Sequence, residues 1–350
     1  MKTITLILVF TLVLTACGGG ASTTPTPNVP ATVDAAVKAT DAAQQSVAAP
    51  VEAAVTATSA AAPTVTPAPT PLPPPPPTAT PIASDQVVTM TEEELAALID
   101  EAVNEAVTAT TATTGATQSV TYDDTITQDE VDALEEYLAA TLAAIEQATA
   151  LIEAYYNLYG ELAEETLAAL QAIEQDLNAL AQDMAEIAAA FDQIDAALQQ
   201  GLALAQETID QLEAAAQTVS AQAQAAQAKA QAWVASLATE LENRAAQMLS
   251  VAPAEVARDR IGAIQSAFAY VETVRASLAD SRVSRDELSN IAQTGANAVA
   301  SLQSRGGAEL QGLAGSINAL TAQIARGQVP QAKVSLGHLE RSLPPKPSLP

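Results

Sequence analysis

The chain has 350 residues, with 41 Asp and Glu against 14 Lys and Arg, and its formal net charge is −27. It contains 1 Cys, 1 His and 1 Trp. One Cys excludes an internal disulfide framework and a CxxC redox or zinc motif, and one His leaves no His-rich metal site. The strong negative charge argues against a protein that binds the phosphate backbone of nucleic acids. We therefore expect neither a metal site nor a nucleic-acid partner.

No catalytic motif is apparent in the sequence. His338 has no cysteine with which to form a nucleophilic dyad, and the glycine-rich motifs of nucleotide-binding proteins and the GxSxG motif of hydrolases are missing. The acidic cluster between 123 and 132 lacks the central Gly of an EF-hand loop. We interpret this cluster as charges that favour the start of a helix. The sequence thus predicts a non-enzymatic protein without a cofactor.

The N-terminus has the pattern of a secretory signal peptide. Lys2 is followed by an apolar run of twelve residues, 3–14, with the sequence TITLILVFTLVL. This run is too short to cross a membrane permanently as a helix, whereas a basic start and a short apolar core are typical of a signal peptide. We therefore expect residues 1–16 to be removed.

The apolar run ends in Leu14-Thr15-Ala16-Cys17, which is followed by three glycines. This sequence resembles the lipobox of bacterial lipoproteins, and Cys17 is the only cysteine in the chain. The resemblance implies that Cys17 carries acyl chains, that 17–20 forms the anchor site, and that the protein is bound to a membrane of the bacterial envelope outside the cytoplasm. That membrane is either the outer face of the cytoplasmic membrane or the outer membrane. An ordinary secretory signal with an incidental cysteine is the alternative.

Residues 21–84 are rich in Ala, Thr and Pro and hold 14 of the 20 prolines. No periodic apolar pattern runs through them, so they cannot bury a core. The Pro-Thr stretch 63–81 favours extended polyproline II structure. We interpret 21–84 as a disordered tether that holds the rest of the chain away from the lipid.

Three positions carry a capping box, in which Ser or Thr is followed three residues later by Glu and apolar residues flank the pair. These pairs are Thr91 with Glu94, Thr127 with Glu130, and Ser284 with Glu287. The first predicts a short helix over 85–107, followed by a Thr-rich linker over 108–126. The second opens a pattern without proline as far as Pro253, which predicts one long acidic helix over 127–252.

The long helix carries a heptad seam, because its apolar residues recur in alternating steps of three and four. The seam residues are Leu170, Ile173, Leu177, Leu180, Met184, Ile187, Phe191, Ile194 and Leu198. The next step, to Leu202, is again four, which is a stutter. Gly160 and Gly201 are the possible breaks, but no Pro or polar loop accompanies Gly160, so the sequence favours a continuous helix there.

The charges suggest how the long helix is covered. Residues 128–250 hold 21 acids and 2 bases, whereas 251–350 hold 8 acids and 10 bases. A C-terminal helical arm over 253–327 could fold back on the acidic helix as an antiparallel hairpin, followed by a disordered tail over 328–350. A parallel or antiparallel oligomer is the alternative. The seam between about 134 and 175 would still need another partner: the short helix 85–107, a second copy or a partner protein.

The sequence therefore predicts an all-α protein: a disordered tether, a long coiled-coil helix and a helical arm folded back as a hairpin. The leading functional hypothesis is a surface-exposed, lipid-anchored structural spacer, adhesin or protein-interaction rod. It would contact the membrane through Cys17 and proteins through the seam. The alternatives are a membrane-active or lipid-binding amphipathic helical protein, and a non-enzymatic extracytoplasmic binding or sensing component.

Overall fold

The computed structural model describes residues 72–76, 82, 84–122, 126–202 and 206–346. These described residues are all-helical, as predicted, and no strand occurs among them. The helices are α2 (Ser84–Val87), α3 (Glu92–Thr121), α4 (Gln128–Tyr159), α5 (Glu164–Gln199), α6 (Gln206–Leu249), α7 (Arg260–Ser277), α8 (Arg285–Arg305), the 3₁₀ turn η1 (Ala308–Leu310), α9 (Gln311–Ala325) and α10 (Val329–Ser342). Cys17 and most of the tether lie outside the described residues.

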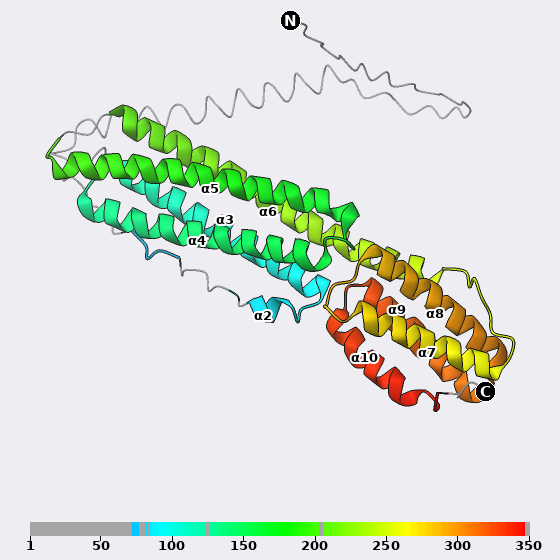
Figure 1. The fold of residues 1–350 in the computed structure, drawn as a ribbon. Coiled ribbons are helices and arrows are strands. Elements are labelled where there is room, and N and C mark those ends of the chain that lie inside the picture. Colours follow the sequence, from blue (N-terminus) through cyan, green and yellow to red (C-terminus); the bar gives the residue numbers. More distant parts are fainter. Residues whose placement is uncertain (1–71, 77–81, 83, 123–125, 203–205, 347–350) are drawn as a thin grey trace, which may run out of the picture. The chain divides into compact units, whose positions relative to one another are not determined.

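Helices α3 to α6 form a four-helix bundle (Figure 1). Each helix packs against two others, because α3 contacts α4 and α6, and α5 contacts α4 and α6. Successive helices joined by short turns run antiparallel, which is the up-and-down arrangement of such bundles. The largest side chains in its core are Trp233, Tyr137, Tyr155 and Phe191, each 1% exposed or less. The buried side chains of this N-terminal bundle belong to a hydrophobic cluster that continues into α7 to α10.

The three predicted helix starts are confirmed. Thr91, Thr127 and Ser284 are N-caps with extended backbone, and each forms both hydrogen bonds of a capping box with the Glu three residues later. These bonds satisfy two N–H groups that have no partner within the helix. The capping pattern therefore located the beginnings of α3, α4 and α8 correctly.

The prediction of one helix over 127–252 is wrong, because the chain turns near both glycines. At the second turn Gly201 has φ +63°, its N–H donates to the Leu198 carbonyl, and the Leu202 N–H donates to the Ala197 carbonyl. This is a Schellman motif, which ends α5 and favours Gly. At the first turn Gly160 caps α4, and α5 begins four residues later. These two turns divide the predicted long helix into α4, α5 and α6.

The predicted short helix 85–107 and Thr-rich linker 108–126 are also wrong, because α3 continues to Thr121. The buried hydroxyls of Thr110, Thr113 and Thr117 each donate to the carbonyl oxygen four residues earlier. Thr113 also lies 2.8 Å from the Thr141 hydroxyl of α4. Threonine is a poor helix former in isolation, but here each of these hydroxyls finds a backbone partner and is buried in the bundle.

The C-terminal arm does not fold back along the acidic helix. Helices α7 to α10 pack on one another as a second, C-terminal bundle, in which α7 contacts α8 and α10, and α9 contacts α8 and α10. Residues 328–342, predicted as part of a disordered tail, instead contain α10, which buries a stripe of Val329, Ala332, Leu336 and Leu339. Pro330 is tolerated at its first turn because no helical partner is needed for its missing N–H.

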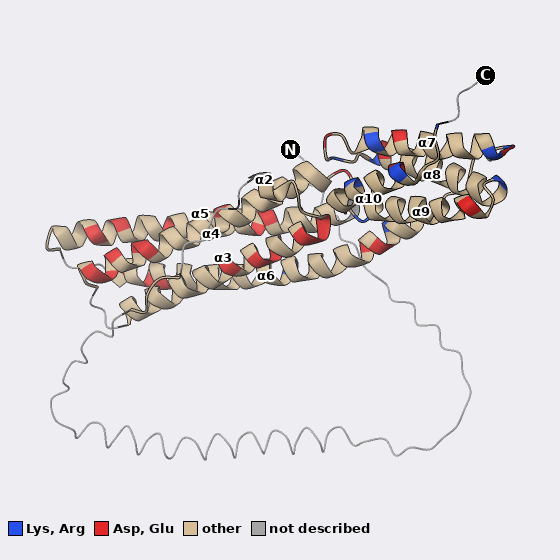
Figure 2. Cartoon of the chain, turned by 90° about the horizontal axis from the view of Figure 1, so that it is seen from below, with Lys and Arg blue, Asp and Glu red and all other residues tan. Residues whose placement is uncertain are grey.

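The charge asymmetry of the sequence corresponds to the division of the chain into two bundles. Figure 2 shows Asp and Glu spread along α3 to α6, whereas most Lys and Arg lie on α7 to α10. The bundles meet where the end of α6 contacts α9, and the Arg326 guanidinium there binds both carboxylate oxygens of Glu242 at 2.9 Å. The arginines of the arm therefore pair mainly with their own bundle and with the end of α6, not with the length of the acidic helices.

Candidate functional site

The predicted seam lies in the core of the N-terminal bundle. Eight of its nine residues, from Leu170 to Ile194, are 1% exposed or less, and Leu198 near the turn is partly buried. Helices α4 and α6 are the neighbours of α5, so they cover this face. The seam is thus buried within one chain, and it does not present an open surface to a partner.

A buried ion pair joins α3 to α6. The Glu92 side chain is 0% exposed and the Arg244 side chain 9% exposed, and one guanidinium nitrogen, Nη2, lies 3.0 Å from both carboxylate oxygens. The Tyr155 hydroxyl of α4 donates to Glu92 Oε1 at 2.8 Å. Three helices therefore converge on one carboxylate. Arg244 is one of only two bases in 128–250, which is the signal in the sequence that could have pointed to a buried partner.

The same carboxylate lies against the C-terminal bundle. The Glu92 N–H donates to the carbonyl oxygen of Gly327 at 3.2 Å, in the turn between α9 and α10. Gly327 has φ +66°, and a Cβ atom there would lie 2.5 Å from the Cβ of Glu92. Glycine is needed both for this backbone conformation and for the close approach. Glu92 therefore takes part both in the ion pair within the N-terminal bundle and in a backbone contact with the C-terminal bundle.

Electrostatics favour a structural role for this cluster. Burial raises the pKa of Glu92, while the charge and hydrogen bond of Arg244 and the hydrogen bond from Tyr155 act against that rise. Burial and the neighbouring carboxylate raise the pKa of Tyr155 well above its usual range, so its hydroxyl remains a donor at neutral pH. Arg244 Nη2 and the Tyr155 hydroxyl both bond to the Glu92 carboxylate and join three helices, whereas Arg244 Nε and Nη1 are buried without a hydrogen-bond partner among the described residues.

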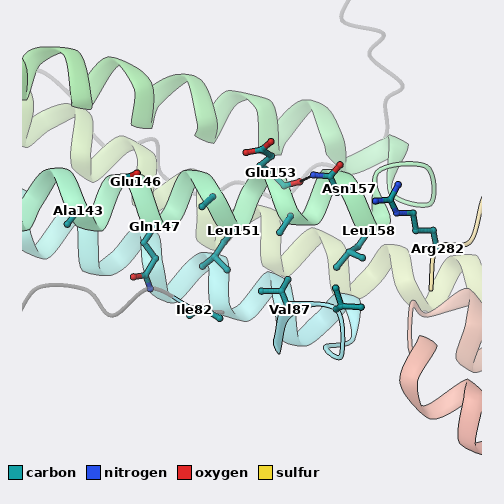
Figure 3. Close-up of a pocket in the computed structure, with 13 residues that line it drawn as sticks. Ile82, Val87, Ala143, Glu146, Gln147, Leu151, Glu153, Asn157, Leu158 and Arg282 are labelled. Carbon is teal, nitrogen blue, oxygen red and sulfur yellow. Dashed lines mark hydrogen bonds between the residues drawn. The ribbon is translucent and has the colours of Figure 1, made fainter. Parts of the chain in front are cut away.

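An open groove runs along the outer face of α4, with a volume of about 660 Å³ (Figure 3). Its floor is formed by Ala143, Gln147, Ala150, Leu151, Ala154 and Leu158 of α4. Ile82, Val87 and Val88 form the opposite wall, and Glu146, Glu153 and Asn157 lie along the rim. Arg282 lies at the end near Leu158. Apart from Gln147, the floor of the groove is apolar and its edges are polar, which is the usual composition of a binding site.

The described residues hold no candidate for a metal site or for a membrane-spanning helix. Within the described ranges, no group of three or more His, Cys, Asp and Glu residues could hold a metal ion. Within the same part of the chain, no helix is both long and apolar enough to cross a membrane. His338 is exposed on α10, and its Nδ1 lies 3.2 Å from Arg341 Nη2.

Comparison with known proteins gives no relative. No protein-family model matches the chain, and no curated protein or solved structure matches it either. Inferences about function therefore rest on the sequence and on the geometry of the described residues.

Proposed function

We propose that this chain is a lipid-anchored protein of the bacterial envelope, located outside the cytoplasm, with a non-enzymatic role as a spacer or in protein interaction. The observation that carries the proposal is the lipobox-like sequence ending in Cys17, the only cysteine in the chain. The Pro-rich segment after it and the helical unit with its own core support the same arrangement. Two or three acyl chains would give a stable anchor where one would not.

The burial of the seam changes how the interaction role is understood. A rod with an open seam would need a partner helix or a second copy to cover it. In this chain α4 and α6 cover that face of α5, so partner recognition falls to the outer surfaces of the bundles. A spacer role needs no further surface, because the tether and the bundles supply length by themselves.

The test is the chemical state of the mature N-terminus. The full chain and its Cys17→Ser variant are expressed in a bacterium, and the N-terminal peptide is measured by mass spectrometry. We expect the native peptide to begin at Cys17 and to carry a diacylglyceryl group, and the protein to partition into detergent. The Cys17→Ser variant should lose both properties. A native N-terminus that begins elsewhere, or that carries no lipid, would contradict the proposal.

A second candidate function is binding to lipid surfaces, and one observation favours it. Tyr122, 89% exposed, and Leu202, 57% exposed, follow the C-terminal ends of α3 and α5, which lie at the same end of the antiparallel bundle. Exposed aromatic and aliphatic side chains at one tip can enter a membrane interface. Co-sedimentation with neutral vesicles that is lost in a Tyr122→Ser/Leu202→Ser variant would support this function, and equal co-sedimentation of both proteins would exclude the tip.

A further inference from the structure

We propose that the groove along α4 binds a cationic amphipathic helix of a partner protein. The proposal names the partner class for the interaction role proposed above. It concerns the helical unit alone, so it can fail or succeed independently of the lipid anchor. Three features of the groove favour such a partner: the shape of its floor, the apolar wall that faces the floor, and the charge around the groove.

The groove floor has the spacing and length needed to pack against a second helix. Ala143, Gln147, Ala150, Ala154 and Leu158 recur in steps of three and four, so they form one stripe along α4. From 143 to 158 this stripe is about 22 Å long, which matches four turns of a partner helix. Three of the five residues are alanines, whose small side chains allow a second helix to approach closely.

This stripe is separate from the core of the bundle. The core of α4 uses other positions, among them Ile152 and Tyr155, which are fully buried, and only Leu151, 4% exposed, belongs both to the core and to the groove lining. By contrast Ala150 is exposed, and Ala143, Ala154 and Leu158 are only partly buried. Helix α4 therefore has a second apolar face that α3 and α5 leave partly open.

The chain on either side of the facing wall is hydrogen-bonded to α4. The Met90 carbonyl accepts from the Tyr159 hydroxyl at 2.7 Å, and the Met90 N–H donates to the Val87 carbonyl at 3.1 Å. Further along, the Tyr137 hydroxyl donates to the Pro73 carbonyl. Val88 on this wall is 49% exposed. A helix on the floor would cover this side chain and be bounded on one side by a fixed apolar surface.

The charge around the groove selects a basic partner. Glu146 and Glu153 are exposed and seven residues apart, so they lie on one side of α4, two turns from each other. The surrounding bundle is strongly acidic, and its two bases are already paired, Lys229 with Asp176 and Arg244 with Glu92. A negatively charged surface attracts cationic ligands and repels anionic ones.

A second copy of the acidic bundle would be repelled for the same reason. Arg282 is the single cation in the lining of the groove, and it lies at one end only, so the length of the rim is free for the lysines or arginines of a partner. The favoured occupant is therefore a helix with one apolar face flanked by basic residues.

The experiment measures binding of designed peptides to residues 18–350, which keep the whole helical unit and omit the cysteine. The probe is an amphipathic 18-residue helix with Leu on one face and Lys on the other, and the matched peptide carries Glu in place of Lys. We expect fluorescence anisotropy to show binding of the Lys peptide that weakens with salt, and no saturable binding of the Glu peptide.

Two pairs of variants locate the site. Reversal of the rim in Glu146→Lys/Glu153→Lys should weaken binding of the Lys peptide by roughly tenfold, whereas Glu186→Lys/Asp192→Lys, with the same charge change on the exposed side of α5, should change it by less than about twofold. Ala150→Trp should fill the groove and abolish binding. Ala139→Trp, also at an exposed position of α4 but outside the lining, should not.

Several results would overturn the proposal. Equal losses in the two charge-reversal variants would mean that the peptide binds the acidic surface at large. Unchanged binding in Ala150→Trp, or no saturable binding of the Lys peptide to the native chain, would remove the groove as its site. Light scattering that shows a dimer of the native chain and a monomer of Ala150→Trp would assign the groove to a second copy. Circular dichroism of each variant checks that the helices remain folded.

Discussion

Removal of the buried arginine should reveal how the ion pair contributes to stability. In Arg244→Met the methionine keeps much of the apolar stem, while the charge and the hydrogen bonds to Glu92 are lost. Breaking a buried pair by removing one partner destabilises a protein by about 3–5 kcal/mol, because the remaining charge is left uncompensated. Since Tyr155 still donates to Glu92, we expect about 3 kcal/mol at neutral pH.

The loss should depend on pH, with a sign set by Glu92. Burial raises the pKa of this carboxyl above 4.5, and without Arg244 the pKa rises further. The folded variant then holds a proton more tightly than the unfolded chain. Its free energy of unfolding therefore falls as the pH rises from about 4.5 through the raised pKa, by up to about 1.4 kcal/mol per pH unit, and levels off above it. The destabilisation should be small near pH 4.5 and largest at pH 7.

Urea unfolding followed by tryptophan fluorescence measures this loss. Trp233 is the single tryptophan, and its ring centroid lies 5.2 Å from that of Tyr155, beside the ion pair. The matched control is Lys229→Met, which breaks the more exposed pair with Asp176 in the same bundle and should cost at most about 1 kcal/mol.

The double variant Glu92→Gln/Arg244→Met removes both charges and keeps a group that can bond to Tyr155. We expect it to recover most of the stability that Arg244→Met loses, because no buried charge is left unpaired. The reasoning is refuted if Arg244→Met costs no more than Lys229→Met and shows the same cost at pH 5 and pH 7.

Two other substitutions test packing in the bundles, both by thermal and urea unfolding. Gly327→Ala should destabilise the chain by about 2–3 kcal/mol, since it adds a clash with Glu92 to an unfavourable positive φ, whereas Gly307→Ala, with φ +71° and open space, should cost about 1 kcal/mol. Equal losses of stability in these two variants would contradict the close contact between Gly327 and Glu92. Ala223→Leu should cost about 1–3 kcal/mol because it overfills a fully buried position of α6, while Ala225→Leu on the exposed face should be nearly neutral. A stable Ala223→Leu variant would mean that α6 is loosely packed.

The sequence was sufficient for the local features of the fold. Helix starts depend on a few neighbouring residues, so Thr91, Thr127 and Ser284 could be identified from their capping boxes. The stutter to Leu202 and the nearby Gly201 were also visible, but the stutter predicts local unwinding of one continuous coiled coil, whereas α5 ends there.

Other features depended on contacts between distant parts of the chain. The helical state of Thr113 and its neighbours is accompanied by burial and by contacts of Thr113 with Tyr137 and Thr141 of α4, which no local pattern shows. Gly160 ends α4 without Pro or a polar loop beside it. The pairing of Glu92 with Arg244 spans 152 residues. None of these features could be predicted from the spacing of apolar residues, because tertiary packing overrides local preference.

The chain covers its own heptad seam by turning near Gly160 and Gly201. Gln128 and Asp195 test this arrangement directly, because the Gln128 Nε2 atom lies 2.6 Å from Asp195 Oδ1, between the start of α4 and the end of α5. In one continuous helix these residues would be roughly 100 Å apart. In residues 18–350, which contain no cysteine, both positions are changed to Cys and treated with a short bis-maleimide. We expect rapid cross-linking within a monomer. Cross-links found only between two chains, or none at all, would contradict this arrangement.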